Sequence, residues 1–260
     1  MIDFTQALVL GVVEGLTEFL PISSTAHLIL VSKALGITQS DFVKTFEIAI
    51  QSGAILAVLA LYFREFFKVE VLKRIIVAFI PTGVVGLVLY KIIKVYLIGN
   101  IAVVLWALAI GGVLMIIFER FPRSGEGVTD ISALTYKQCL AVGLCQSVAV
   151  IPGVSRSAAT IVGGLMLGVS REAIVKFSFL LAVPTMVAAT GFDILKNYTL
   201  FDGSSIGVLV VGFFAAFVTA IIAIKFLLSF VRNHTFTGFG VYRIALVLFC
   251  LLAMGAGFYS

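Results

Sequence analysis

The sequence predicts an all-α polytopic membrane protein built as an inverted-topology repeat, with six transmembrane helices and two re-entrant helical hairpins that meet near the midplane. Of the 260 residues, 61% are hydrophobic and only 12% are charged, and the mean hydropathy is +1.19. Six apolar runs are long enough to cross ~30 Å of hydrocarbon. Two further apolar stretches are interrupted by turn residues and match each other along the chain.

The low charge content excludes a disordered chain, a nucleic-acid binder and an ordinary soluble enzyme. A soluble domain carries ~25% charged residues, and the polar side chains of this chain are too few to cover such a surface. The net charge of +5 comes from basic residues in short loops, which indicates membrane topology and contact with anionic headgroups. We therefore expect membrane lipids as partners and no nucleic acid. The sequence leaves open whether the protein forms a homodimer.

The six apolar runs are expected to span the membrane as helices. Charged residues mark their ends, such as Arg64 and Glu65 after the first run and Glu119 and Arg120 after the third. The expected spans are 43–62, 75–95, 101–118, 173–191, 206–230 and 240–259.

Two other stretches, 6–31 and 138–168, are expected to enter the membrane and return to the same side. Each is apolar but is broken in its middle by a turn rich in proline and serine, around Pro21 and Pro152. Neither half of a stretch can cross the hydrocarbon layer, because a helix rises only about 1.5 Å per residue. Both are therefore predicted to be re-entrant helix–turn–helix hairpins.

The two hairpin stretches align without a gap when Gln6 is placed on Gln138. Chance similarity between apolar segments explains hydrophobic matches, but matched serine, glycine and lysine residues favour a duplication. We predict two repeats, 1–125 and 130–260, each with one hairpin and three spans; an odd number of crossings inverts the second repeat. Identical pairs include Gln6/Gln138, Gly11/Gly143, Ser23/Ser155, Gly36/Gly168 and Lys44/Lys176.

Loop charges predict the orientation of this fold. With the ambiguous Lys44, Arg156, Lys225 and Arg243 set aside, re-entrant hairpins place ten basic residues on one side and four on the other, whereas spanning stretches give eight and six. The positive-inside rule favours the first arrangement, which puts both termini outside and opens the first hairpin outward. The larger group is Arg64, Lys68, Lys73, Arg74, Arg120, Arg123, Lys137, Arg171, Lys176 and Arg232, and the smaller is Lys33, Lys91, Lys94 and Lys196.

Glu14 and Glu18 are four residues apart, so both carboxylates lie on one face of the first half-helix. Carboxylates inside a membrane are costly unless they are paired, protonated or facing water. They are candidate ligands of a divalent cation or acid/base groups, and a pair that locks helix packing is the alternative. Ser24 and His27, three residues apart, are a candidate nucleophile and base, although a lone histidine is commonly a buried core residue.

Both turns also carry a helix-start signal, with hydroxyls that can cap the second half-helix. Two helix N-termini that face each other favour an anion such as phosphate, and Arg156 adds a bidentate cation. Arg156 can also pair with Glu14 or Glu18 in the empty protein, while Gln51 is expected to serve packing. The set indicates phosphate chemistry at a lipid-accessible position. The candidate phosphate-binding residues are Ser23, Thr25, Ser155, Arg156, Ser157 and Thr160.

These two motifs resemble those of the undecaprenyl pyrophosphate phosphatase family, the integral-membrane type that is linked to bacitracin resistance. The first motif is EGLTEFLPISST at 14–25, followed by His27, and the second is PGVSRS at 152–157, followed by Thr160. The resemblance extends over essentially the whole chain. Ala26 and Ala158 stand where the family usually has glycine, a small change that bears on turn geometry more than on activity.

The resemblance implies hydrolysis of undecaprenyl pyrophosphate to undecaprenyl phosphate and inorganic phosphate, which recycles the carrier lipid of cell-wall synthesis. It also implies a divalent cation, Mg²⁺ or Ca²⁺, and an active site open to the outer face of the bacterial plasma membrane. In the expected mechanism, Arg156 holds the pyrophosphate, and Glu14 and Glu18 bind the cation or orient His27. Ser24 attacks with His27 as base, and attack by water activated by Glu18 or His27 fits the residues equally well.

A transporter is the competing class of function. Inverted repeats with broken helices that meet at the midplane are a common transporter plan, and a polyprenyl-phosphate flippase needs only the anion site. Ser24, His27 and the two glutamates favour hydrolysis because transport needs no nucleophile.

Overall fold

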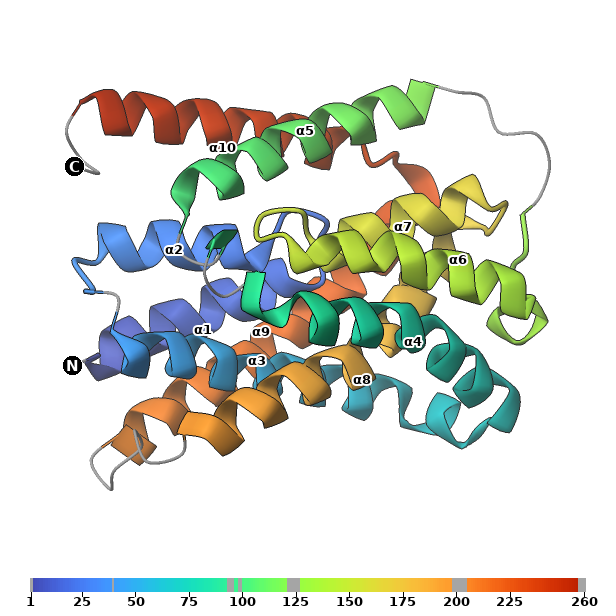
Figure 1. Cartoon of the computed structure of the whole chain (residues 1–260), viewed down its shortest axis with the longest axis horizontal. Helices are drawn as coiled ribbons and strands as arrows, with labels where there is room; N and C mark the ends of the chain where they lie inside the picture. The colour runs from blue at the N-terminus through green and yellow to red at the C-terminus, as the bar shows by residue number, and fades with distance from the viewer. Residues whose placement is uncertain are drawn as a thin grey trace.

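The computed structural model describes residues 2–38, 40–92, 96–97, 100–120, 127–197 and 205–256, and over these residues it contains helices and no strand (Figure 1). Val128 and Val169 form an isolated bridge between two loops. The predicted all-α class is confirmed.

Six of the described helices are long and apolar enough to cross a membrane, as predicted. They begin up to six residues before the apolar runs; α4, for example, starts at Val69, because polar first-turn residues such as Glu70 belong to the helix but not to its hydrophobic part. Some predicted features lie outside the described residues. These are the ends of spans 75–95 and 240–259, the residues Lys94 and Arg123, and the repeat boundary at 125. The six helices are α3 (Asp41–Tyr62), α4 (Val69–Ile92), α5 (Ile101–Arg120), α8 (Arg171–Asn197), α9 (Ser205–Asn233) and α10 (Thr237–Gly255).

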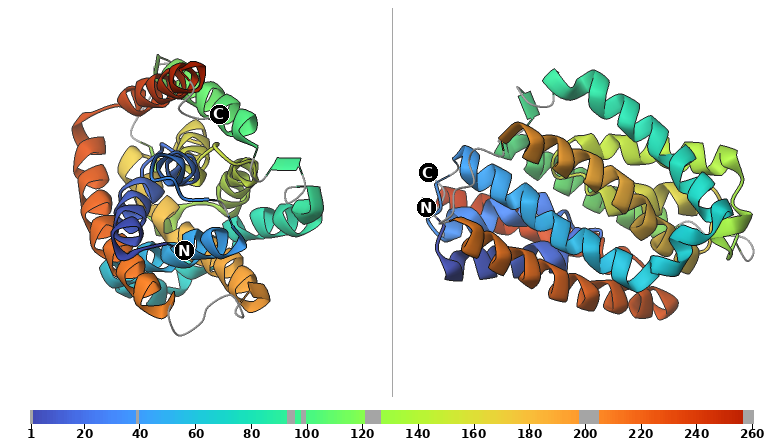
Figure 2. Two further views of the ribbon diagram at one scale, coloured as in Figure 1. Left: turned by 90° about the vertical axis from the view of Figure 1, so that its left-hand side faces the viewer. Right: turned by 90° about the horizontal axis from the view of Figure 1, so that it is seen from below.

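Four shorter helices form the two hairpins. The first hairpin is α1 (Phe4–Glu18) with α2 (Ser24–Ala34), and the second is α6 (Tyr136–Ser147) with α7 (Arg156–Met166). Their 11 to 15 residues make helices of about 16–22 Å. In Figure 1 and Figure 2, α1 starts and α2 ends at the end of the molecule where α10 ends, whereas α6 starts and α7 ends at the opposite end. Both turns therefore lie inside the molecule.

Several local features of the first hairpin recur at the matching positions of the second. Each hairpin begins with a capping box, Asp3 with Gln6 and Thr135 with Gln138. Gln6 Nε2 also donates to the carbonyl of Leu35 at 3.3 Å, and Gln138 Nε2 to that of Leu167 at 3.0 Å. These bonds tie the start of each hairpin to its end. The glycines after the second half-helices, Gly36 and Gly168, both have positive φ, 67° and 76°.

Each hairpin packs on a long helix of the other half of the chain. Helix α1 lies against α9 and α6 lies against α4, while α3 packs on α8 and α5 on α10. Gly11 and Gly143 permit the close approach, because a Cβ on Gly11 would overlap the carbonyl oxygen of Gly212, and one on Gly143 that of Ala78. The two turns thereby face each other in the interior.

Candidate functional site

The two hairpin turns have the same unusual backbone conformation. Ser23 and Ser155, the residues just before α2 and α7, both have φ of 71°, a region that non-glycine residues rarely adopt. The Ser155 hydroxyl accepts a hydrogen bond from the Ala158 N–H at 3.2 Å, which is the predicted helix cap. Ser23 makes no such side-chain bond. The helices α2 and α7 thus each begin directly after a serine in a strained backbone conformation.

Glu18 links the two hairpins at the centre of the site. Its Oε1 accepts a hydrogen bond from Arg156 Nη2 at 2.8 Å, and its Oε2 accepts one from the Ser24 hydroxyl. The Glu18 and Arg156 side chains are only 10% and 12% exposed. This buried ion pair therefore joins the end of α1 to the start of α7, with the Ser24 hydroxyl beside it.

Arg156 is held on several sides but keeps hydrogen-bonding capacity. Its Nη1 donates to the carbonyl of Ser178 at 3.0 Å, and its guanidinium lies 5.6 Å from the Phe19 ring centroid. Its Nε is buried and has no partner among the described residues. A planar cation with a free donor is suited to binding phosphate oxygens.

A cavity of about 130 Å³ lies between the two turns. At about 30 Å³ per water molecule, it has room for a few waters or a phosphate group. Gln51 of α3, for which packing is the favoured role from the sequence, also lines this cavity. Its lining residues from the predicted set are Glu18, Ser23, Ser24, Thr25, Ser155 and Arg156.

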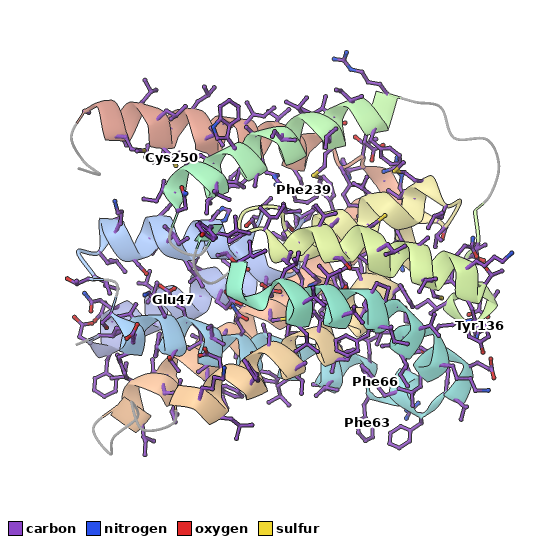
Figure 3. The ribbon with its side chains drawn as sticks, in the orientation of Figure 1. Glu47, Phe63, Phe66, Tyr136, Phe239 and Cys250 are labelled. Carbon is purple, nitrogen blue, oxygen red and sulfur yellow. The ribbon has the colours of Figure 1, made fainter. Side chains whose placement is uncertain are left out.

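Glu14 lies one turn before Glu18 and is completely buried. Neither of its carboxylate oxygens has a hydrogen-bond donor among the described residues. The charges that act on it are those of Glu18, Glu47 and Arg156. Glu47 of α3, which sequence reasoning did not single out, accepts a hydrogen bond from the Ser32 hydroxyl of α2 at 2.7 Å (Figure 3). A buried carboxylate without donors is suited to a bound cation or a proton.

His27 faces away from Ser24 and towards α10. Its Nδ1 donates to the carbonyl of Ser23 at 2.8 Å, so its Nε2 is the acceptor of the Tyr242 hydroxyl at 2.7 Å. The two rings are parallel, with centroids 5.6 Å apart. The structure therefore brings Glu18, and not His27, into contact with the Ser24 hydroxyl.

Ser157 and Thr160 bind other parts of the protein. The Ser157 hydroxyl donates to the carbonyl of Phe19 at 2.8 Å, which joins the two turns. The Thr160 hydroxyl lies 2.8 Å from the carbonyl of Arg156 and 3.3 Å from Oε1 of Gln146. Both side chains are completely buried and neither lines the cavity.

Sequence reasoning missed two residues of α10 that touch the hairpins. Tyr242 contacts His27, and Arg243, which was set aside as ambiguous, donates to carbonyls of the second turn. A signal for Arg243 was present, because an arginine inside an apolar run is as costly there as Arg156 is in the second hairpin.

Comparison with known proteins gives a consistent result over nearly the whole chain. A family model described as "Bacitracin resistance protein BacA" matches residues 7–249. A protein named undecaprenyl-diphosphatase from Aquifex aeolicus (strain VF5) is 49% identical over 94% of this chain and 95% of its own length. Proteins of the same name from Sulfurihydrogenibium sp. (strain YO3AOP1) and Bdellovibrio bacteriovorus are 51% and 46% identical, over 93% and 98% of this chain and 95% and 97% of theirs. With six apolar helices in the part of it that the structure describes, the chain is a multi-pass integral membrane protein.

Proposed function

We propose that this chain, which belongs to the bacitracin resistance protein BacA family, hydrolyses undecaprenyl diphosphate to undecaprenyl phosphate and inorganic phosphate. The observation that carries the proposal is the contact of Glu18 with both Ser24 and Arg156, which places a carboxylate, a hydroxyl and a cation around one cavity. The product is the carrier lipid that cell-wall synthesis reuses.

In the proposed reaction, Arg156 binds the diphosphate and neutralises the charge that develops on its oxygens. The Ser24 hydroxyl is already aligned on Glu18, so Glu18 takes the hydroxyl proton as Ser24 Oγ bonds to the terminal phosphorus. The bond from that phosphorus to the bridging oxygen breaks, and undecaprenyl phosphate leaves. Water then hydrolyses the phosphoserine, and Ser24 recovers a proton as inorganic phosphate departs.

Direct attack by water is the second route compatible with these residues. In that route Glu18 accepts a proton from the water and Ser24 only binds the phosphate. His27 is proposed to support the turn through its bonds to Ser23 and Tyr242, since both of its ring nitrogens are engaged.

Glu14 and Glu18 are proposed to hold a divalent cation, Mg²⁺ or Ca²⁺. The two buried Glu14 oxygens without donors fit such an ion, whose charge offsets the burial of the carboxylate. Among the described residues no group of three or more acidic, cysteine or histidine side chains forms a metal site, so Glu14 and Glu18 are the residues that would hold the ion. A bound cation supplies charge neutralisation of the diphosphate.

The hairpins are proposed to be re-entrant, in two inverted repeats that span 1–125 and 130–260. The recurring capping boxes, glutamine bonds and positive-φ residues support this proposal. So does the position of the hairpins' open ends, which lie at opposite ends of the molecule while the turns meet inside it (Figure 1). The ten-to-four distribution of basic residues supports both termini, and the open side of the site, on the outer face of the bacterial inner membrane.

The decisive experiment is release of phosphate from undecaprenyl diphosphate by the purified protein, with and without a chelator. We expect release that the chelator abolishes and that excess Mg²⁺ or Ca²⁺ restores. We also expect loss of release in Glu18→Ala and not in Gln138→Ala, whose side chain lies at the start of the second hairpin. Absence of release by the wild type, together with movement of the lipid between leaflets of a vesicle, is the result that the flippase alternative requires.

A further inference from the structure

Arg243 lies in the transmembrane helix α10, and its guanidinium donates hydrogen bonds to backbone carbonyls. It is completely buried in α10 and forms no ion pair with a carboxylate among the described residues. Its Nε and Nη2 donate to the carbonyls of Leu108 and Ala107 in α5, at 3.3 and 3.1 Å. Its Nη1 and Nη2 donate to Val154 and Gly153 in the second hairpin turn, at 3.1 and 2.9 Å.

The turn that Arg243 contacts leads directly into the phosphate site. Gly153 and Val154 precede Ser155 and Arg156, and both Gly153 and Ser155 have positive φ, 95° and 71°. Glycine adopts positive φ freely, but the conformation of Ser155 persists only when its surroundings hold it in place. Arg243 supplies such support, because a fixed guanidinium constrains two consecutive carbonyls of the turn.

The surroundings of Arg243 leave space for its guanidinium. A Cβ on Gly111 of α5 would lie 2.5 Å from Arg243 Nη2 and 2.9 Å from its Cζ, which is too close for any real contact. Glycine at 111 is therefore required for the observed position of the guanidinium. Arg243 does not line the cavity, so its effect on the site must pass through the turn.

We propose that Arg243 is a positioning residue for the hydrolysis, which holds the second hairpin turn so that Arg156 meets Glu18 and the diphosphate. The neighbouring residue Tyr242 bonds to His27 in the first hairpin, so two consecutive residues of α10 fix both turns. This inference rests on the proposed function, and its test separates binding from chemistry.

The test uses two variants that disturb the same contact from opposite sides, Arg243→Lys and Gly111→Ala. Lysine keeps the positive charge but lacks the planar guanidinium whose N–H groups reach several carbonyls at once. Alanine at 111 displaces that guanidinium without changing residue 243 itself. The probe is a non-hydrolysable methylene-diphosphonate analogue of undecaprenyl diphosphate. We expect each variant to bind it at least about tenfold more weakly and to show a raised KM for the true substrate, as follows from disturbed charged hydrogen bonds.

Two matched controls and a double variant complete the test. Gly86→Ala introduces a methyl group where no atom lies within 4 Å, and Arg232→Gln removes an exposed guanidinium paired with Glu172. Both controls should bind the analogue like the wild type. The two test changes act on one contact. The double variant Gly111→Ala/Arg243→Lys should therefore bind the analogue no more weakly than whichever single variant has the lower affinity.

Three results would overturn the inference. One is analogue binding by folded Gly111→Ala and Arg243→Lys within about twofold of the wild type. The second is a loss of analogue affinity in the double variant equal to the sum of the two single losses. The third is a loss of analogue binding in the variants that is fully explained by their fraction of unfolded protein. If the wild type binds the analogue but releases no phosphate, the proposed hydrolysis fails while the positioning role is still decided by the binding data.

Discussion

Glu14 and Gln146 occupy matching positions of the two hairpins, but only Gln146 is held by hydrogen bonds among the described residues. Gln146 Nε2 donates to the hydroxyls of Thr82 and Thr185 at 2.9 and 3.2 Å. Both Glu14 oxygens lack a donor. The first hairpin therefore buries a carboxyl group without a donor where the second buries a satisfied amide, and this difference supports the proposal that a cation binds in the first hairpin.

Glu14→Gln is expected to lose activity without losing stability. The amide removes the charge that a cation needs, so phosphate release should fall by about a hundredfold or more, while removal of a buried charge leaves the thermal midpoint unchanged or higher. Phosphate release at saturating Mg²⁺ and thermal unfolding in detergent measure the two effects. The control is Gln146→Glu, which buries a new carboxylate and should lower the midpoint. Activity of Glu14→Gln equal to that of the wild type would exclude the cation site.

Ser24 and Ser157 are expected to respond differently to alanine. Ser24→Ala removes the hydroxyl bonded to Glu18 and should reduce phosphate release by about a thousandfold if Ser24 is the nucleophile. Ser157→Ala removes only the bond to Phe19 and should cost about 1 kcal/mol of stability while activity persists.

A phosphoserine intermediate decides between the two chemical routes. Acid quenching followed by mass spectrometry should find phosphate on the peptide that contains Ser24, and none on that peptide in Ser24→Ala. Full activity of Ser24→Ala would establish attack by water instead.

The ion pair of Glu18 and Arg156 is expected to separate stability from function. Arg156→Met alone leaves a buried carboxylate and should lower the free energy of unfolding by about 3–5 kcal/mol. The double variant Glu18→Met/Arg156→Met should regain most of that loss but no phosphate release. Denaturant unfolding of the three proteins measures this, and a double variant as unstable as the single one would contradict it.

Cysteine labelling tests the orientation. In a background without Cys139, Cys145 and Cys250, Thr5→Cys at the exposed start of α1 should react with an impermeant reagent on intact cells. Asn233→Cys, exposed at the end of α9, should react only after lysis, because it lies at the opposite end of the molecule. The reverse pattern would invert the proposed topology.

Composition and spacing predicted the helical class, the six spans and the two broken stretches, because hydrocarbon thickness and helix rise leave few alternatives for apolar runs of these lengths. Helix starts such as Val69 were less well predicted, since capping and polar first turns lie outside the apolar signal.

Side-chain partners in the site were only partly accessible from the sequence. The pairing of Arg156 with Glu18 is one of the two pairings that the sequence allowed. The orientation of the His27 side chain towards Tyr242 depends on a contact between residues 215 positions apart. A local sequence pattern cannot predict such a contact. The bond of Ser157 to the carbonyl of Phe19 likewise depends on how the two turns pack together, whereas Thr160 bonds only within the second hairpin.

The packing of α1 on α9 and of α6 on α4 sets the order in which the chain can assemble. During synthesis α1 emerges first, but α9, the helix it packs against, begins only at Ser205 and ends at Asn233. Until α9 has been made, α1 can pack only on neighbours from its own half of the chain, such as α2 and α3. We therefore expect two halves expressed from separate messages to restore activity only when both reach the same membrane.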